Sequence, residues 1–355
     1  MILTPWTKKK AAANTRNVFA AALLSFGFFT TTAFTQSSSD FVEPSAREVE
    51  PARPLAAIVP QERIATSIDL GRIVLPGTTG GILGSLLISA ADRTPEKLAA
   101  RAAERAERFA RPLAAALEGF DVPPLADKAT SAAASEVTWF ASGPTQNFVG
   151  EAVSDHLVDG VNITPDSTVS MTFATGWIDE EANDTRGAAA WNEERKRLER
   201  EFLEANFDAG EVATVTWRYQ LSSDFTNIQV IADMALRRKG SASPHYEQQL
   251  ISIVKLRHPT FVEEENVAIW AANDAAFARL ALTLAFERAG EVLPSIIALD
   301  EEGMVRAMDK KRKSVTSAGF HGPELFRDDK GSVFFARDGD QRLKAFVTVQ
   351  TIRNR

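Results

Sequence analysis

Two adjacent runs of alternating apolar and polar residues constrain the fold of this chain most strongly. In the first run, Val215, Trp217, Tyr219 and Leu221 alternate with Thr216, Arg218 and Gln220. After the polar stretch Ser222-Ser223-Asp224, Ile228, Val230, Ala232, Met234 and Leu236 repeat the pattern. Alternation with a period of two is typical of a strand that buries one face. The pair of runs around a short polar turn therefore predicts an antiparallel β-hairpin.

The rest of the second half adds strands and amphipathic helices. A third strand is predicted over Tyr246 to Leu256, and a second hairpin pairs 332–337 with 342–351. Residues 185–207 predict a charged amphipathic helix, and Thr260-x-x-Glu263 is a capping box that opens a long apolar helix. We expect an α+β fold over 121–355, with a mainly antiparallel sheet of hairpins packed against these helices.

The N-terminus has the composition of an export signal. Lys8, Lys9, Lys10 and Arg16 precede an apolar run from Val18 to Phe29, and small residues 31–33 follow it. We predict a cleaved signal peptide over 1–33. A permanent membrane anchor is the alternative, although the run is shorter than the roughly 20 apolar residues of a spanning helix. Residues 34–60, rich in serine, proline and glutamate, predict a disordered acidic linker.

Charge and cysteine content indicate the compartment and the class of partner. The chain has no cysteine, so it cannot form disulfides, a thiolate metal site or a cysteine-linked lipid anchor. Loss of the four cationic leader residues takes the formal net charge from −7 to −11. Such an acidic chain is a poor nucleic-acid binder, and we expect a periplasmic location. The basic run Lys310 to Lys313 predicts a solvated loop, with contact to lipid phosphates or another polyanion as the alternative.

Residues 61–120 contain a β-like segment, a glycine-rich apolar segment and a charged helix. No charge occurs from Ile73 to Ala91, and Gly77, Gly80, Gly81 and Gly84 form two overlapping Gly-x-x-x-Gly pairs. Such pairs let helices approach closely in lipid, so segment 77–91 is a candidate for membrane association or self-association. The structural alternative, which the sequence favours, is a buried strand, a glycine turn and a short core helix over 82–91. A phosphate loop is not indicated, because the Gly-Lys-Ser/Thr and Gly-x-Gly-x-x-Gly spacings are missing.

Motifs for catalysis or metal binding are not found. His156, His245, His258 and His321 never occur three or four residues apart, and residues 179–190 lack the glycine and glutamate of a calcium loop. Ser252 and Lys255 match Ser-x-x-Lys, but on a strand they would point to opposite faces. We therefore expect no cofactor and no metal site. A dispersed Ser-His-Asp triad leaves a periplasmic hydrolase as the alternative to a non-enzymatic protein.

The segment Tyr219-x-Leu221-Ser-x-Asp224-Phe225, together with the glycine-rich segment and the charged helix, resembles uncharacterised exported proteins of Gram-negative bacteria. The resemblance implies a location in the cell envelope and brings no activity and no site residue with it. Our expectation is a non-enzymatic envelope protein that contacts the membrane, another envelope protein or a second copy of itself.

Overall fold

The computed structural model describes residues 39–47, 53–68, 106, 108–141, 143–152, 156–158, 186–241, 243–337 and 344–353. The compact unit to which they belong runs from Ser37 to Arg355. The described parts of 61–120 and of 121–355 therefore belong to one folded unit.

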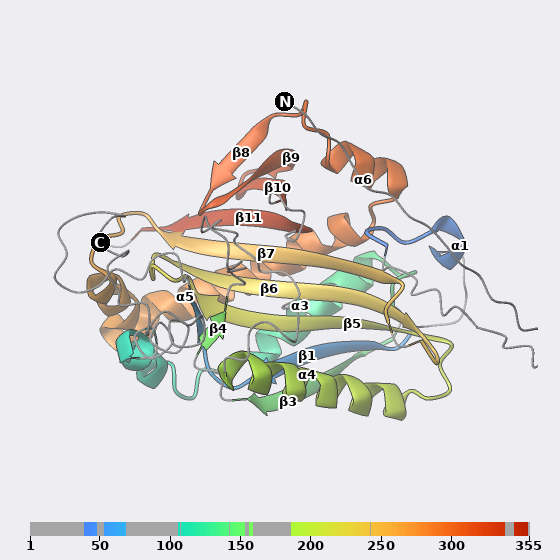
Figure 1. Cartoon of the computed structure of the whole chain (residues 1–355), viewed down its shortest axis with the longest axis horizontal. Helices are drawn as coiled ribbons and strands as arrows, with labels where there is room; N and C mark the ends of the chain where they lie inside the picture. Colours follow the sequence, from blue (N-terminus) through green and yellow to red (C-terminus); the bar gives the residue numbers. More distant parts are fainter. Residues whose placement is uncertain are drawn as a thin grey trace, which may run out of the picture. The chain divides into compact units, whose positions relative to one another are not determined.

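The centre of the fold is a mixed, mostly antiparallel sheet (Figure 1). Its strands are β1 Leu55–Gln61, β2 Ala65–Ile68, β3 Thr145–Ala152, β4 His156–Val158, β5 Glu211–Leu221, β6 Asn227–Arg238, β7 Tyr246–Leu256, β8 Ser314–Ser317, β9 Phe320–Asp328, β10 Gly331–Arg337 and β11 Lys344–Ile352. The order across the sheet is β3-β1-β5-β6-β7-β11-β10-β9-β8, and β2 pairs with both β4 and β5. The α+β class is thus confirmed.

The helices are α1 Pro44–Arg47, α3 Pro123–Glu136, α4 Arg186–Ala205, α5 Glu263–Ile297 and α6 Glu301–Ala307, and residues 108–116 are also helical. In Figure 1, α4 lies in front of the sheet over β1 and β3, whereas α3 and α5 lie behind it. The sheet is therefore covered by helices on both faces.

The predicted hairpin and third strand are confirmed as three consecutive antiparallel strands. Val215 pairs with Met234 and Tyr219 with Val230, so the apolar positions of β5 and β6 share one face. Strand β7 has the predicted bounds, and β10 and β11 form the second predicted hairpin. The parallel pairs were not predicted: β1 pairs with β3 and β5, β2 with β4 and β5, and β11 with β7.

The prediction of a disordered linker over 34–60 is wrong for its described parts, 39–47 and 53–60. Ser39 pairs with Tyr246, Val42 is buried, and α1 occupies Pro44–Arg47. Strand β1 occupies Leu55–Gln61, pairs on both sides, and has every residue buried. Ala57 and Val59 belong to the core beneath α3 and α5, while Ala56 and Ile58 contact the core under α4. A strand with helices on both faces needs a continuous apolar run, which is what this sequence supplies.

The main core lies between the sheet and helices α3 and α5. The Trp217 and Phe286 rings are 5.1 Å apart, and the Trp217 indole N–H donates to Thr130 Oγ1 at 2.9 Å, which links β5 to α3. Full burial of a large apolar side chain contributes about 1.5–3 kcal/mol. Gly290 of α5 lies against Ala129 of α3, where a Cβ would be 3.0 Å from the Ala129 Cα. Small residues thus set the close approach of the two helices.

The long helix α5 starts where predicted, but its first turn differs from a capping box. Val262 is the N-cap residue, and Thr260 instead exchanges hydrogen bonds with the backbone of Val262. Asn266 Oδ1 accepts from the Thr260 amide at 2.9 Å. Residues Ala272–Ala275 have non-helical dihedral angles and divide α5 in two. Asn and Asp tolerate the left-handed conformation found at positions 273 and 274 better than most residues.

Candidate functional site

The glycines singled out in the sequence, Gly77, Gly80, Gly81 and Gly84, lie outside the described residues. Much of the charged helix predicted within 61–120 also lies outside them. The chain on either side of the glycine-rich segment is described. Strand β2 ends at Ile68 and pairs with β5, and Leu113 in the helix at 108–116 is fully buried in the main core.

The first polar cluster lies at the end of the sheet where β5 starts and β6 ends. This sheet-end cluster comprises Arg53, Glu211, Arg238 and His245. The Glu211 carboxylate accepts from Arg53 Nε at 2.5 Å and from Arg238 Nε at 3.0 Å, and lies 3.4 Å from His245 Nε2. Arg53 also donates to the carbonyl oxygen of Trp139, and only 3% of it is exposed. The Glu211 carboxylate therefore accepts hydrogen bonds from two guanidinium groups and lies close to an imidazole.

The sheet-end cluster shifts the pKa values of two of its members. Burial lowers the pKa of the His245 imidazole and outweighs the opposite effect of the Glu211 charge. Burial also tends to raise the pKa of Glu211, but the hydrogen bonds from Arg238 and Arg53 leave it lowered. Glu211 is therefore ionised at neutral pH, and His245 favours its neutral form. The His245 side chain is 14% exposed, whereas His258 and His321 are exposed residues, a difference that the sequence around His245 does not indicate.

The second polar cluster lies on the sheet face beside α4. This polar tract comprises the polar side chains of β5, β6 and β7 that alternate with the core positions: Thr214, Thr216, Arg218, Gln220, Gln229, Asp233 and Gln249. Gln220 Nε2 donates to Gln229 Oε1 at 3.0 Å, and Gln249 Nε2 donates to Asp233 Oδ1 at 2.6 Å. The Arg218 guanidinium lies 5.4 Å from the centre of the Trp191 ring on α4.

The residues of this tract were read from the sequence as the polar side of a half-buried hairpin. In the structure Thr216 and Gln220 are 3% and 1% exposed, so both faces of β5 are buried. Burying a polar group lowers the stability of the folded protein unless the group is hydrogen-bonded. The side-chain amides meet part of that need: Gln220 donates to Gln229 across the strands, and Gln229 donates to Asn227 within β6, while Gln220 Oε1 is buried with no hydrogen-bond partner. Alternation of apolar and polar residues does not distinguish a polar strand face exposed to solvent from a polar face that is buried in the protein.

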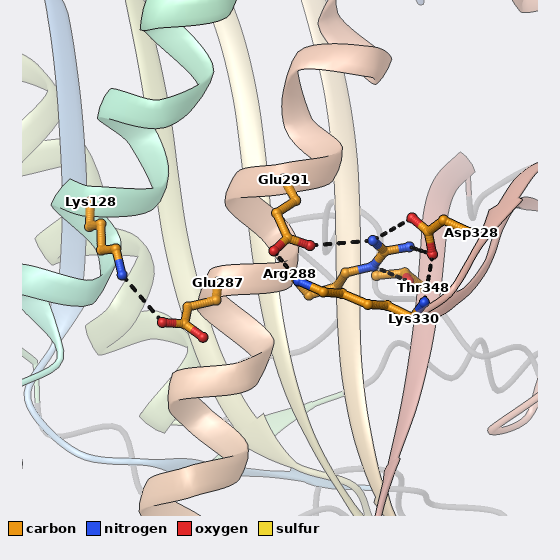
Figure 2. A network of polar contacts seen from close by, with 7 residues as sticks. All are labelled: Lys128, Glu287, Arg288, Glu291, Asp328, Lys330 and Thr348. Atoms are coloured by element: carbon orange, nitrogen blue, oxygen red, sulfur yellow. Dashed lines mark hydrogen bonds and ion pairs between the residues drawn. The ribbon is translucent and has the colours of Figure 1, made fainter.

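The third cluster joins α5 to the far half of the sheet and is drawn in Figure 2. Arg288 of α5 donates from two nitrogens to the Asp328 carboxylate, at 2.7 and 2.9 Å, and from Nε to Thr348 Oγ1 at 3.2 Å. Glu291 lies 3.4 Å from the same guanidinium and also pairs with Lys330. Arg288 is 3% exposed, and this network links β9, the turn after β9 and β11 to the core helix. Its geometry is that of a structural link.

The residues considered for metal binding or nucleophilic catalysis are not brought together. Within the described ranges, no group of three histidine or acidic side chains could hold a metal ion. Ser252 is fully buried on β7, and the segment that carries Ser252 and Lys255 is a strand, as expected. His321 lies exposed on β9, where its Nδ1 is 2.7 Å from Thr316 Oγ1. The three glutamates 263–265 form the first turn of α5, where the helix dipole favours carboxylates.

Comparison with known proteins found no matching protein-family model, curated protein or solved structure. Among the described helices, α5 alone is long and apolar enough to cross a membrane by length and composition. Leu282, Phe286 and Leu293 of α5 are buried in the main core, so the helix has a structural role in the folded domain.

Proposed function

We propose that this chain is a non-enzymatic protein of the Gram-negative cell envelope, exported to the periplasm. In this proposal it works by association, through segment 77–91, with the membrane, with another envelope protein or with a second copy of itself. The observation that supports it is the placement of the segment between two folded parts of one domain. Strand β2 pairs with β5 before it, and Leu113 is packed into the main core after it.

This placement matters because an uncharged run of 19 residues, Ile73 to Ala91, lies in the sequence between residues of the same domain. Two overlapping Gly-x-x-x-Gly pairs within such a run permit close helix contacts. The nearest described residues, Ile68 before the run and Ala106 after it, belong to the same folded unit.

Export is supported by the leader and by the start of the folded chain. Ser39 forms a bridge with Tyr246 of β7, and Val42 is 1% exposed in the main core. The domain thus uses residues that begin shortly after the expected cleavage at 31–33. Cleavage there would remove the basic and apolar leader while leaving these contacts in place.

Fractionation and native mass measurement of glycine variants test the proposal. Gly80→Leu and Gly81→Leu, alone and together, should move the protein from the membrane fraction or an oligomer to a soluble monomer. The unfolding midpoint should not change. Gly210→Leu is the matched control, because Gly210 is exposed and a Cβ there would meet no atom within 4 Å. A wild-type protein that is already a soluble monomer, or glycine variants with unchanged distribution and mass, would overturn the proposal.

A periplasmic hydrolase is the second candidate, favoured by the buried pair of His245 and Glu211. Glu211 lies 3.4 Å from His245 Nε2, which is the carboxylate–imidazole neighbourhood of a hydrolytic triad without its hydrogen bond, since both ring nitrogens of His245 are buried and unbonded. Hydrolysis of ester or amide substrates by the wild type, lost in His245→Gln at unchanged stability, would establish this candidate. Equal residual rates in the two proteins would dismiss it.

A further inference from the structure

We infer that the basic loop Asp309–Lys313 is a docking site for the phosphate groups of an anionic lipid surface. The loop joins α6 to β8, and in Figure 1 these two elements lie on the opposite side of the sheet from β3. The inference rests on the proposed location in the envelope, because that location favours lipid over nucleic acid as the source of phosphate. It adds a site that the glycine-rich segment does not include.

Hydrogen bonds hold the loop in one conformation. Asp309 Oδ1 accepts from the Lys311 amide at 2.9 Å, and the Asp309 carbonyl accepts from the Arg312 amide at 3.0 Å. The Glu324 amide donates to the Lys313 carbonyl at 2.8 Å, which fastens the end of the loop to β9. A loop that is already ordered loses less conformational entropy when it binds a ligand.

Arg312 has a different role from the three lysines. Its Nε donates to the carbonyl oxygen of Glu324 at 2.8 Å, and its Nη2 donates to that of Leu325 at 2.9 Å. The guanidinium therefore anchors the loop to β9 through neutral acceptors and keeps its positive charge uncompensated. Lys310, Lys311 and Lys313 are exposed around this anchor.

The local charge is strongly positive. In the described part of the chain, Lys310 and Lys311 form no ion pair, and the Lys313 ammonium is 3.6 Å from Glu324 with 67% of its side chain exposed. Glu324 is shared, since it also accepts from Arg327 at 2.8 Å and from Ser332 at 2.6 Å. The loop and its neighbour Arg327 thus carry five cations against the carboxylates of Asp309 and Glu324.

The net charge of the whole chain does not prevent this contact. The chain carries −7, but at 0.1 M salt charges more than about 10 Å away are largely screened. An anionic surface that touches the loop therefore meets mainly the local cations. A lysine close to such a surface strengthens binding by about fivefold, so the two unpaired lysines together contribute about thirtyfold.

Vesicle co-sedimentation of the purified protein tests the inference. The vesicles are phosphatidylcholine alone and phosphatidylcholine mixed with phosphatidylglycerol. Lys310→Glu/Lys311→Glu should bind the anionic vesicles at least about thirtyfold more weakly than the wild type, and 1 M salt should abolish the difference. The control is Lys128→Glu/Lys196→Glu, which changes the net charge equally at lysines of α3 and α4 whose side chains are 71% and 37% exposed and pair with Glu287 and Glu193. Urea unfolding of each variant checks that the fold is kept.

Several outcomes would overturn the inference. Equal weakening by the two double variants would show that only net charge matters, and wild-type binding to pure phosphatidylcholine would show that the contact is not electrostatic. Lysine-dependent binding of a short single-stranded DNA without binding to the anionic vesicles would assign the loop to another polyanion.

Loss of vesicle binding in Gly80→Leu/Gly81→Leu but not in Lys310→Glu/Lys311→Glu would remove this inference and keep the proposed function. The reverse pattern, with lysine-dependent binding and glycine variants unchanged in mass and distribution, would remove only the proposed function.

Discussion

Replacing Asp328 by asparagine should destabilise the domain more than replacing its partner Arg288 by methionine. Breaking a buried ion pair from one side costs about 3–5 kcal/mol, because the remaining charge is uncompensated. The Asp328 side chain is 34% exposed, so we reduce the expected cost of Asp328→Asn to about 2 kcal/mol. Arg288 is 3% exposed and cannot regain water, and Glu291, at 3.4 Å, compensates it only in part.

Arg288→Met leaves a different residue without its partner. The Asp328 carboxylate can take up water through its exposed side, and methionine can fill much of the space of the arginine stem. We expect a cost of about 1 kcal/mol from the lost hydrogen bonds. The double variant should resemble Arg288→Met alone, because no unpaired buried charge remains. Against a typical total stability of 5–15 kcal/mol, each of these differences is measurable.

Urea unfolding of the four proteins measures this order, with equal m-values required for comparison. The pH dependence gives a second readout. Burial tends to raise the pKa of Asp328, but the hydrogen bonds and charge of Arg288 leave it lowered. A lowered carboxyl pKa stabilises the folded state above the unfolded value of about 3.9, and that contribution is lost as the pH falls through the folded pKa. The difference in the free energy of unfolding between the wild type and Asp328→Asn should therefore disappear as the pH falls into the acid range. A larger cost for Arg288→Met, or a gap independent of pH, would refute the reasoning.

Three further predictions use other parts of the fold. Gly322→Ala should lower stability by at least about 2 kcal/mol, since its Cβ would lie 1.8 Å from a carbonyl oxygen of β10, whereas Gly210→Ala should have no such effect; thermal unfolding compares the two. Thr130→Val should cost about 1–3 kcal/mol in urea unfolding, because it leaves the buried indole N–H of Trp217 without an acceptor. The His245 ring should titrate below pH 6.5 by NMR, because burial lowers its pKa in the folded state. The stability of the wild type should therefore fall as the pH drops below 6.5, and His245→Gln should lack this component. A titration midpoint above 6.5 would contradict the burial argument.

The sequence predicted the elements whose periodicity is local. Strands β5, β6 and β7 and helix α4 follow from alternation or amphipathic spacing, and the structure confirms them. Strand β1 was missed because a short apolar run buried on both faces has no alternation, and it follows a stretch rich in proline and glutamate. Its parallel pairing with β3 and β5 depends on residues roughly 90 and 160 positions away, which no local pattern encodes.

The polar clusters were harder to predict than the core. Arg288 and Asp328 are 40 positions apart, and Arg53 and Glu211 are 158 apart, so only the fold brings each pair together. The basic run Lys310 to Lys313 was visible in the sequence. Its hydrogen bonds to β9 were not, because they depend on the turn that follows β8. The four basic residues look alike in the sequence, but in the structure Arg312 anchors the loop and the three lysines are exposed cations.

The central claim is that this domain is exported and that its leader is removed. Mass measurement and N-terminal sequencing of the protein from a periplasmic extract of a Gram-negative host test the claim most directly. We predict a mature chain that begins shortly after residues 31–33, upstream of Ser39 and its bridge to Tyr246. A full-length chain with Met1 intact in the cytosolic fraction would contradict it.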